Sequence, residues 1–260
     1  MNKLIYFKAP MVFGHRGFSE NAPENTKASF DMCIENLIPG IETDVHKCKT
    51  GEIVITHDFN LKRVGGLNQT VEETSWSTLK TLDVGSFKDS KFKNERILLL
   101  DQLLEEYNTK FYYDIELKVP SKYISSEMHR DIFNIIKKHN LVDYILVSSF
   151  NPIALGKFKR ASQGTIPTAD IFCKTKDVPK FLQTGNGRFF SHSTYLKPNF
   201  TQVNFEFMKR FKKKPIITWT VNTESEALNL LSLGVDGLIG NNPVILKHAV
   251  ETFQKNKREK

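Results

Sequence analysis

The stretch Met11-Val12-Phe13-Gly14-His15-Arg16-Gly17 joins a short apolar run to a polar string bounded by glycines. Its first half is typical of a buried β-strand, and an amphipathic helix is expected soon after it, at residues 25–36. The next extended runs are residues 40–46 and residues 52–57. Short strands that alternate with longer helices are typical of a parallel α/β fold.

The same alternation continues to the C-terminus. Further strands are expected at residues 112–119, 144–150, 166–172, 189–195, 215–221 and 235–240. Helices are expected at residues 124–139, 152–160, 178–184, 202–212, 224–233 and 243–254. These elements make about eight strand–helix pairs, the number that closes a (β/α)8 TIM barrel. We therefore predict an α/β fold of this kind, built as one domain over residues 1–260.

One segment interrupts the alternation. Residues 60–96 are polar and only weakly periodic, apart from a short helix expected at residues 74–82. A segment of this length inside a compact domain is usually functional, or it carries structure of its own. We interpret it as a small insertion after the second strand region.

The net charge of +8 has a plain explanation, because most of the lysines are scattered along the chain. The densest basic groups, at residues 209–214 and 255–260, lack the interleaved aromatic residues of a nucleic-acid platform. We therefore expect no nucleic-acid partner. A positive field would still attract an anionic small-molecule substrate or an anionic membrane surface.

Three cysteines at wide spacing predict free thiols in a reducing compartment. The N-terminal apolar run is too short for a signal peptide, and no stretch is long enough to span a membrane. These features predict a cytoplasmic protein without stable membrane insertion, and they leave the oligomeric state open.

Two carboxylates lie two residues apart in Ile41-Glu42-Thr43-Asp44. On a strand, alternation puts Glu42 and Asp44 on the same face, where their charges repel unless a cation lies between them. Glu116 repeats the pattern on another predicted strand. Surface acids would explain any one of these residues alone. Three carboxylates without a cysteine partner favour a hard cation, so we predict a site for Mg²⁺ or Ca²⁺.

Two permanent cations accompany these acids. Lys118 shares a strand face with Glu116, and its ammonium could reach phosphate oxygens as a point charge. Arg16 offers a planar fork for the same oxygens, and the glycines on either side of His15-Arg16 allow a close backbone approach. A surface arginine and an exposed salt bridge are the plainer explanations.

His15 and His57 are the candidate proton carriers, because histidine titrates near neutrality and one imidazole can accept a proton while the other donates one. His46 lies two residues past Asp44 and could face the same pocket. The remaining histidines are interpreted as structural; they are His129, His139, His192 and His248.

Two other segments have structural explanations. Pro23-Glu24-Asn25-Thr26 suits the capped and charged start of a helix. Trp219, at the end of a predicted strand, could pack in the core or form a wall of the substrate pocket. Both interpretations of Trp219 stay open.

Eight motifs follow one another in a characteristic order along nearly the whole chain. They are Gly14-His15-Arg16-Gly17, Pro23-Glu24-Asn25-Thr26, Glu42-x-Asp44, His57-Asp58, Glu116-x-Lys118, Ser149-Phe150, Trp219-Thr220-Val221-Asn222 and Gly234-Val235-Asp236-Gly237. In this order the set resembles the glycerophosphodiester phosphodiesterase family. The resemblance implies a barrel of the phospholipase C-like phosphodiesterase type, with an insertion after the His-Asp motif, where residues 60–96 lie.

The resemblance also implies roles for individual residues. His15 and His57 would form the general acid/base pair, Glu42, Asp44 and Glu116 would hold the metal, and Arg16 and Lys118 would contact the phosphate. The chain departs from the family at two places. Gly240-Asn241-Asn242-Pro243 stands where the family commonly has Thr-Asp-x-Pro, and Thr43 and His46 stand where it often has apolar residues.

The expected reaction is metal-dependent hydrolysis of a glycerophosphodiester, such as glycerophosphocholine, to sn-glycerol 3-phosphate and an alcohol. Water or the glycerol 2-hydroxyl could attack, and either histidine could be the acid.

Two alternatives remain. A lysophospholipase D or other lipid-headgroup phosphodiesterase would need an apolar track, for which the insertion offers Leu61, Val64, Leu67, Trp76 and Phe87. A catalytically lapsed binding protein on the same fold is disfavoured, because all seven proposed site residues are present.

Overall fold

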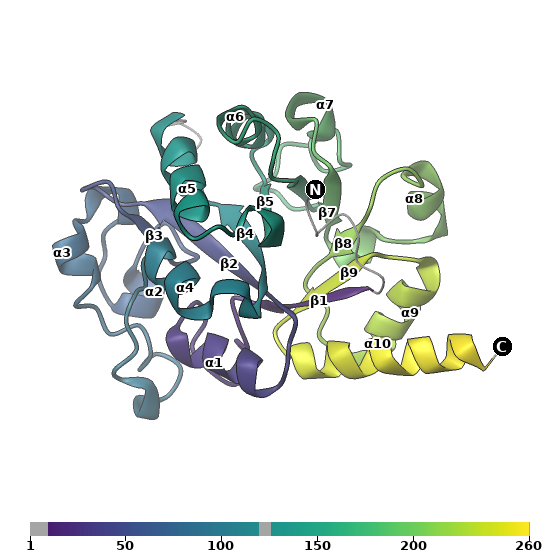
Figure 1. Ribbon diagram of the computed structural model, residues 1–260, viewed down its shortest axis with the longest axis horizontal. Helices are drawn as coiled ribbons and strands as arrows, with labels where there is room; N and C mark the ends of the chain where they lie inside the picture. The colour runs from purple at the N-terminus through teal and green to yellow at the C-terminus, as the bar shows by residue number, and fades with distance from the viewer. Residues whose placement is uncertain (1–9, 120–125, 260) are drawn as a thin grey trace.

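Eight parallel strands form a barrel at the centre of the molecule in this computed structural model, which describes residues 10–119 and 126–259 (Figure 1). The strands are β1 (Met11–His15), β2 (Gly40–Lys47), β4 (Tyr112–Leu117), β5 (Ile145–Ser149), β6 (Thr168–Phe172), β7 (Tyr195–Pro198), β8 (Ile217–Thr218) and β9 (Gly237–Gly240). Their order is β7-β6-β5-β4-β2-β1-β9-β8, and parallel bridges at 196–216 and 199–219 join β7 to β8. The predicted (β/α)8 barrel is confirmed.

Helices surround the strands, and one short strand lies outside the circle (Figure 1). The helices are α1 (Lys27–Glu35), α2 (Lys62–Gly65), α3 (Trp76–Leu79), α4 (Leu100–Tyr107), α5 (Ser126–Lys138), α6 (Pro152–Ala161), α7 (Arg188–Ser191), α8 (Phe205–Arg210), α9 (Glu224–Leu233) and α10 (Pro243–Arg258). The extra strand, β3 (Ile53–Ile55), pairs antiparallel with β2. Within the described residues, no helix combines the length and apolar composition needed to cross a bilayer.

Local sequence explains where several helices begin. Thr26 caps α1, and its side chain and that of Ser29 form a reciprocal capping box. Thr223 and Glu226 do the same for α9, while Pro152 and Pro243 occupy the first turns of α6 and α10. The helix predicted over residues 124–139 starts outside the described residues. Residues 1–9 also lie outside them.

Two predicted elements are wrong, and the helices α2, α4 and α7 were not predicted. Residues 189–195 do not form a strand, because Phe189 and Phe190 belong to α7 with 62% and 60% of their surface exposed. Residues 178–184 form turns, in which the Gln183 amide donates to the carbonyls of Thr175 and Val178. The longest of the three unpredicted helices, α4, has its buried residues at the helical spacing 100, 103, 104 and 107.

The barrel interior changes from apolar to polar along the strands. Its amino-terminal end is filled by one apolar cluster, which contains Met11, Phe13, Leu146, Ala169, Tyr195, Ile217 and Ile239. Two residues further along, the inward positions of several strands carry His15, Glu42, Asp114, Ser148 and Lys197. The outward residues of the same strands pack against the helices in the main core. Period-two alternation therefore separates the core from a polar upper interior.

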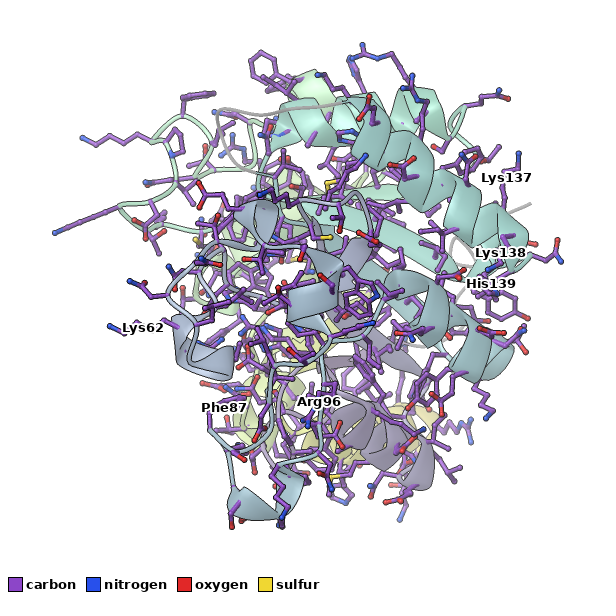
Figure 2. All side chains as sticks on the ribbon, turned by 90° about the vertical axis from the view of Figure 1, so that its left-hand side faces the viewer. Lys62, Phe87, Arg96, Lys137, Lys138 and His139 are labelled. Atoms are coloured by element: carbon purple, nitrogen blue, oxygen red, sulfur yellow. The ribbon has the colours of Figure 1, made fainter. Side chains whose placement is uncertain are left out.

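The insertion at residues 60–96 packs around a small apolar cluster that it shares with Cys48, Val54 and Ile97. Leu61 and Val64 are buried there against Val71, Leu79 and neighbours near β3. The short helix predicted at residues 74–82 is present as α3. Figure 2 shows this side of the molecule, with Lys62 and Phe87 toward its edge. Since Leu61 and Val64 fill this cluster, they cannot supply the apolar track expected of the insertion.

Candidate active site

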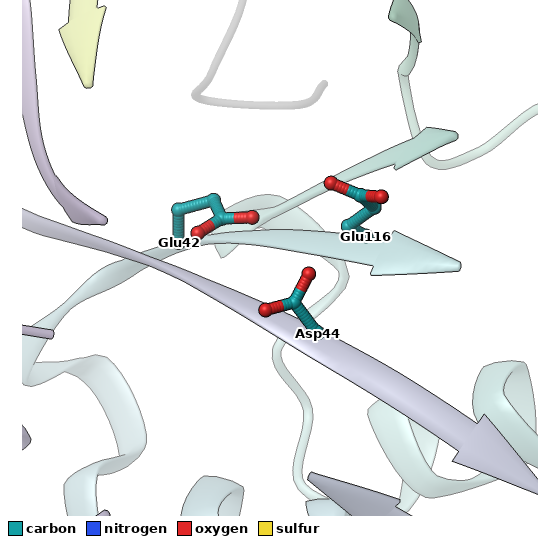
Figure 3. A group of neighbouring side chains, drawn as sticks. All are labelled: Glu42, Asp44 and Glu116. Carbon is teal, nitrogen blue, oxygen red and sulfur yellow. The ribbon is translucent and has the colours of Figure 1, made fainter. Parts of the chain in front are cut away.

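The three predicted metal ligands lie together in the upper part of the barrel. Glu42 and Asp44 project from β2, and the register places Asp44 beside Glu116 on β4. Each carboxylate contributes an oxygen that lies within 4.8 Å of the others (Figure 3). All three residues are buried, with 1%, 1% and 7% of their surface exposed. The predicted shared face of Glu42 and Asp44 is therefore confirmed.

Lys118 and Arg16 lie directly against this cluster. Lys118 Nζ is 3.1 Å from Asp44 Oδ1 and 2.5 Å from Glu116 Oε1, and Arg16 Nε is 3.4 Å from Asp44 Oδ2. Burial alone would raise the pKa of Asp44, but Lys118 and Arg16 outweigh it and hold that pKa well below its usual range. Burial, together with the neighbouring Asp44 carboxylate, raises the pKa of Glu42 well above its usual range.

A buried ion pair beneath the carboxylates was not predicted from the sequence. Lys197, with 2% of its surface exposed, places Nζ 2.7 Å from Asp114 Oδ2 and 3.9 Å from Glu42 Oε1. The ammonium also donates to Ser148 Oγ at 3.2 Å, and that hydroxyl donates to Asp114 Oδ1 at 2.6 Å. Glu42 therefore lies near the positive charge of Lys197, just as Asp44 lies near those of Lys118 and Arg16.

The local charge count favours a bound cation. Four carboxylates meet three cations in this part of the barrel: Glu42, Asp44, Asp114 and Glu116 face Arg16, Lys118 and Lys197. Asp44 Oδ1 is buried with Lys118 Nζ 3.1 Å away, but it accepts no hydrogen bond from the described residues. Buried charge needs compensation, and an all-oxygen donor set suits Mg²⁺ or Ca²⁺. The residues present therefore fit a divalent metal.

His15 lies at the end of β1 beside the same carboxylates. Its Nε2 is 4.0 Å from Glu42 Oε2, and its Nδ1 is 2.6 Å from Asn241 Oδ1. Asn241 stands two residues before Pro243, where the Thr-Asp-x-Pro pattern has its aspartate. The partner of His15 is thus a neutral amide here. Burial, together with the charge of Arg16, lowers the pKa of His15 to about 3.

His57 follows β3 and is less buried, with 31% of its side chain exposed. Its Nδ1 is 2.7 Å from the Asp58 carboxylate, which in turn accepts from Arg63 Nε at 2.6 Å. Burial lowers the pKa of His57, whereas the Asp44 charge opposes that shift. The Asp44 charge also acts on the pKa of His15. The two imidazoles therefore share one electrostatic environment.

Arg63 connects the insertion to the barrel through Glu24. Its guanidinium donates to both Glu24 oxygens, at 2.9 and 2.6 Å, and Arg16 Nη1 donates to Glu24 at 2.9 Å. Asn25 also reaches the site, because its amide donates to Asp44 Oδ2 at 2.9 Å. The structural explanation of Pro23-Glu24-Asn25-Thr26 was thus incomplete, since the motif caps α1 and also holds Arg16 and Asp44.

The glycines around Arg16 serve the packing of the backbone. A Cβ at Gly17, which has φ +80°, would lie 2.3 Å from Ser29 Oγ, so only glycine lets α1 approach this turn. Arg16 itself adopts φ 57°, and its backbone N–H donates to Glu42 Oε2 at 3.1 Å. The turn therefore fixes one metal-ligand candidate through the main chain.

The other sequence candidates are placed as follows. His46 is buried, with Nδ1 2.8 Å from Glu72 Oε1 and Nε2 3.3 Å from the His57 carbonyl, so it supports the loop that carries His57. Trp219 donates its indole N–H to the Lys197 carbonyl and packs edge-on against Phe150. Figure 2 shows His139 near the end of α5, where its Nε2 lies 2.8 Å from Asp101.

Comparison with known proteins agrees with this arrangement. The model of the glycerophosphoryl diester phosphodiesterase family matches residues 15–245, which include every candidate residue described above. The chain belongs to this family. The predicted enzyme class, a phosphoric diester hydrolase of the glycerophosphodiester phosphodiesterase type, is confirmed with it.

Several relatives of the family match over most of their length. A glycerophosphodiester phosphodiesterase of Caldanaerobacter subterraneus subsp. tengcongensis is 28% identical over 92% of this chain and 97% of its own. One from Bacillus altitudinis is 29% identical, over 89% and 94%. Among solved structures, an Oleispira antarctica phosphodiesterase in complex with the product sn-glycerol-3-phosphate is 27% identical, with a TM-score of 0.83 over 94% of this chain and 97% of that one.

Proposed function

We propose that the protein hydrolyses glycerophosphodiesters, such as glycerophosphocholine, to sn-glycerol 3-phosphate and an alcohol, in a reaction that requires a divalent metal. One observation carries the proposal: three buried carboxylates from two strands converge beside two imidazoles and two permanent cations. The product held by the Oleispira relative supports the choice of substrate class.

Glu42, Asp44 and Glu116 would hold the metal, either Mg²⁺ or Ca²⁺. When bound, such an ion supplies Lewis-acid polarisation of a phosphoryl oxygen. Arg16 and Lys118 would contact the non-bridging oxygens and stabilise the negative charge that develops there. Glu24 holds the Arg16 guanidinium in place, so this donor is already oriented before substrate arrives.

His15 and His57 would transfer the protons. In both imidazoles Nδ1 is occupied, by Asn241 in one case and by Asp58 in the other, which leaves Nε2 for the reacting atoms. One Nε2 would take a proton from the attacking hydroxyl, and the other would give a proton to the departing alkoxide.

Three further assignments accompany this proposal. Trp219 would form a wall of the substrate pocket, as its position after β8 and its contact with Phe150 support. The chain would be one domain, with residues 60–96 as an insertion whose cluster also includes Val54 of β3. The location would be cytoplasmic, which the three free, buried cysteines support.

The test is release of glycerol 3-phosphate from glycerophosphocholine, with and without a chelator. We expect chelation to abolish turnover, added Mg²⁺ or Ca²⁺ to restore it, and alanine at His15 or His57 to lower kcat by at least about a hundredfold. His248→Ala is the matched control, because that imidazole pairs with exposed Glu224 far from the barrel interior. Full activity in the chelator would contradict the metal requirement.

A further inference from the structure

The positive charge of the chain is concentrated between β5 and β8. Residues 151–214 contain 13 of the 37 lysines and arginines but only three of the 29 acids, and one of those acids, Asp170, is buried. In the rest of the chain, acids outnumber lysines and arginines. The net charge of +8 therefore comes from the segment that forms α6, α7 and α8 on the outside of the barrel.

The same segment exposes apolar side chains. Among the described residues, it supplies five of the nine large apolar side chains that are exposed: Ile153, Phe181, Phe189, Phe190 and Phe205. Two of them, Phe189 and Phe190, are neighbours on α7. Single exposed apolar residues are common, but adjacent ones surrounded by cations mark an interaction surface.

Cations lie on both sides of these two rings. On the side of α6, which Figure 1 shows next to α7, a hollow of about 480 Å³ is lined by Lys159, Arg160 and Phe190. Lys159 Nζ donates to the His192 carbonyl at 2.8 Å, which holds the ammonium at the end of α7. One exposed ring and two cations therefore face the same hollow.

On the side of α8, the cations lie over aromatic rings. Arg188 Cζ is 4.0 Å from the centre of the Phe189 ring. Arg188 and Arg210 both lie over the ring of Phe211, at 5.0 and 4.9 Å from its centre. These contacts join α7 to the end of α8 in one basic and aromatic surface.

Five cations of this surface, called the basic flank, form no salt bridge with any acid of the described chain; they are Lys159, Arg160, Arg188, Arg210 and Lys214. The Asp170 charge acts on Arg188, but Asp170 is buried and cannot meet a partner. Burial, together with the charges of Lys159 and Arg188, lowers the pKa of Lys214. The cations therefore repel one another, and an anionic partner would relieve that repulsion.

We propose that the basic flank, together with Phe189 and Phe190, binds reversibly to an anionic phospholipid surface. The two phenyl rings enter the membrane interface, and the cations contact lipid phosphates. This mode of binding needs no membrane-spanning helix. It is independent of the proposed function, because it concerns the outside of the barrel.

The rings favour a membrane over a nucleic acid or a second copy of the chain. Arg188 covers one face of the Phe189 ring, and the Phe190 ring packs edge-on against Phe181 with centroids 6.5 Å apart. Neither ring is a fully open platform on which a base could stack. A second copy docked through the same face would bring like charges together.

The experiment is cosedimentation of the full chain with vesicles of phosphatidylcholine alone, or mixed with an equal amount of phosphatidylglycerol. We expect binding to the mixed vesicles, weaker binding to the neutral ones, and a decrease as added salt screens the charges. Lys159→Gln/Arg160→Gln should weaken binding about 25-fold, since each cation near an anionic surface contributes about fivefold. Phe189→Ser/Phe190→Ser should weaken it by at least about tenfold.

Two variants on the side of the molecule shown in Figure 2 are the matched controls. Lys62→Gln/Lys138→Gln removes the same charge there, and Phe87→Ser removes an exposed ring. Both should bind the mixed vesicles as the wild-type protein does.

Weaker binding by both flank variants and by neither control supports the inference. Wild-type protein that does not bind the mixed vesicles overturns it. An equal loss in Lys62→Gln/Lys138→Gln also overturns it, because net charge alone would then be the cause. Retention of a single-stranded DNA oligonucleotide or of polyglutamate, without binding to vesicles, would assign the surface to a nucleic acid or an acidic protein instead. Failure of the proposed function would appear separately, as a loss of glycerophosphocholine turnover in the absence of vesicles.

Discussion

Replacing Lys197 with methionine should destabilise the protein strongly, although the apolar part of the side chain is kept. The ammonium is almost fully buried, 2.7 Å from Asp114 and 3.9 Å from Glu42. Its removal leaves two buried carboxylates without their nearest cation. Breaking a buried ion pair from one side costs about 3–5 kcal/mol of unfolding free energy, and methionine recovers little of it because the packing was not the main term.

The assay is urea unfolding at neutral pH, followed by circular dichroism. The double variant Lys197→Met/Asp114→Asn should recover at least half of the lost free energy, because the amide still accepts from Ser148 without carrying a charge. Lys138→Met is the matched control: Lys138 is 61% exposed and pairs with Asp101 on the surface, so its loss should cost less than about 1 kcal/mol.

If Lys197→Met unfolded at the same urea concentration as Lys138→Met, the buried ammonium would not be compensating the acids. Alternatively, the double variant could be as unstable as the single one, which would make the loss of packing around Lys197 the cause.

Three further predictions concern single side chains. Burial raises the pKa of Asp170 to about 7, so between about pH 4 and 7 the folded state holds a proton that the unfolded chain loses. The free energy of unfolding should therefore fall on the order of 4 kcal/mol as the pH rises from about 4 through 7. Urea unfolding of Asp170→Asn should show a flatter dependence on pH. Asn241→Asp should raise the pKa of His15, seen by NMR titration, because a carboxylate at that place stabilises the imidazolium; an unchanged pKa would contradict the contact. Arg63→Met should lower kcat by about tenfold with little change in melting temperature, because Asp58 loses the group that orients it; an unchanged kcat would exclude a positioning role.

The sequence was sufficient to predict the carboxylate cluster because strand alternation leaves little freedom. Once Glu42 and Asp44 lie on one parallel strand and Glu116 on the next, the register brings all three together. The same rule was available for Asp114, which lies two residues before Glu116 and so shares its face.

Lys197 was missed for a different reason. The predicted strand at residues 189–195 ended two residues too early, so Lys197 fell outside any element that could point it inward. Phe189 and Phe190, which the predicted strand included, are exposed on α7. Arg63 had no local signal at all, since its contacts with Glu24 and Asp58 depend on how the insertion folds back on the barrel.

Calorimetric titration of the metal-free protein with Mg²⁺ and with Ca²⁺ tests the metal site directly. If Glu42, Asp44 and Glu116 surround one cation, at least one of these ions should bind at one site per chain and raise the melting temperature, since a ligand of the folded state stabilises it. Glu116→Gln should weaken that binding sharply, whereas Glu127→Gln, outside the cluster, should leave it unchanged. Equal binding by wild-type protein and Glu116→Gln would show that Glu42, Asp44 and Glu116 do not hold the ion together.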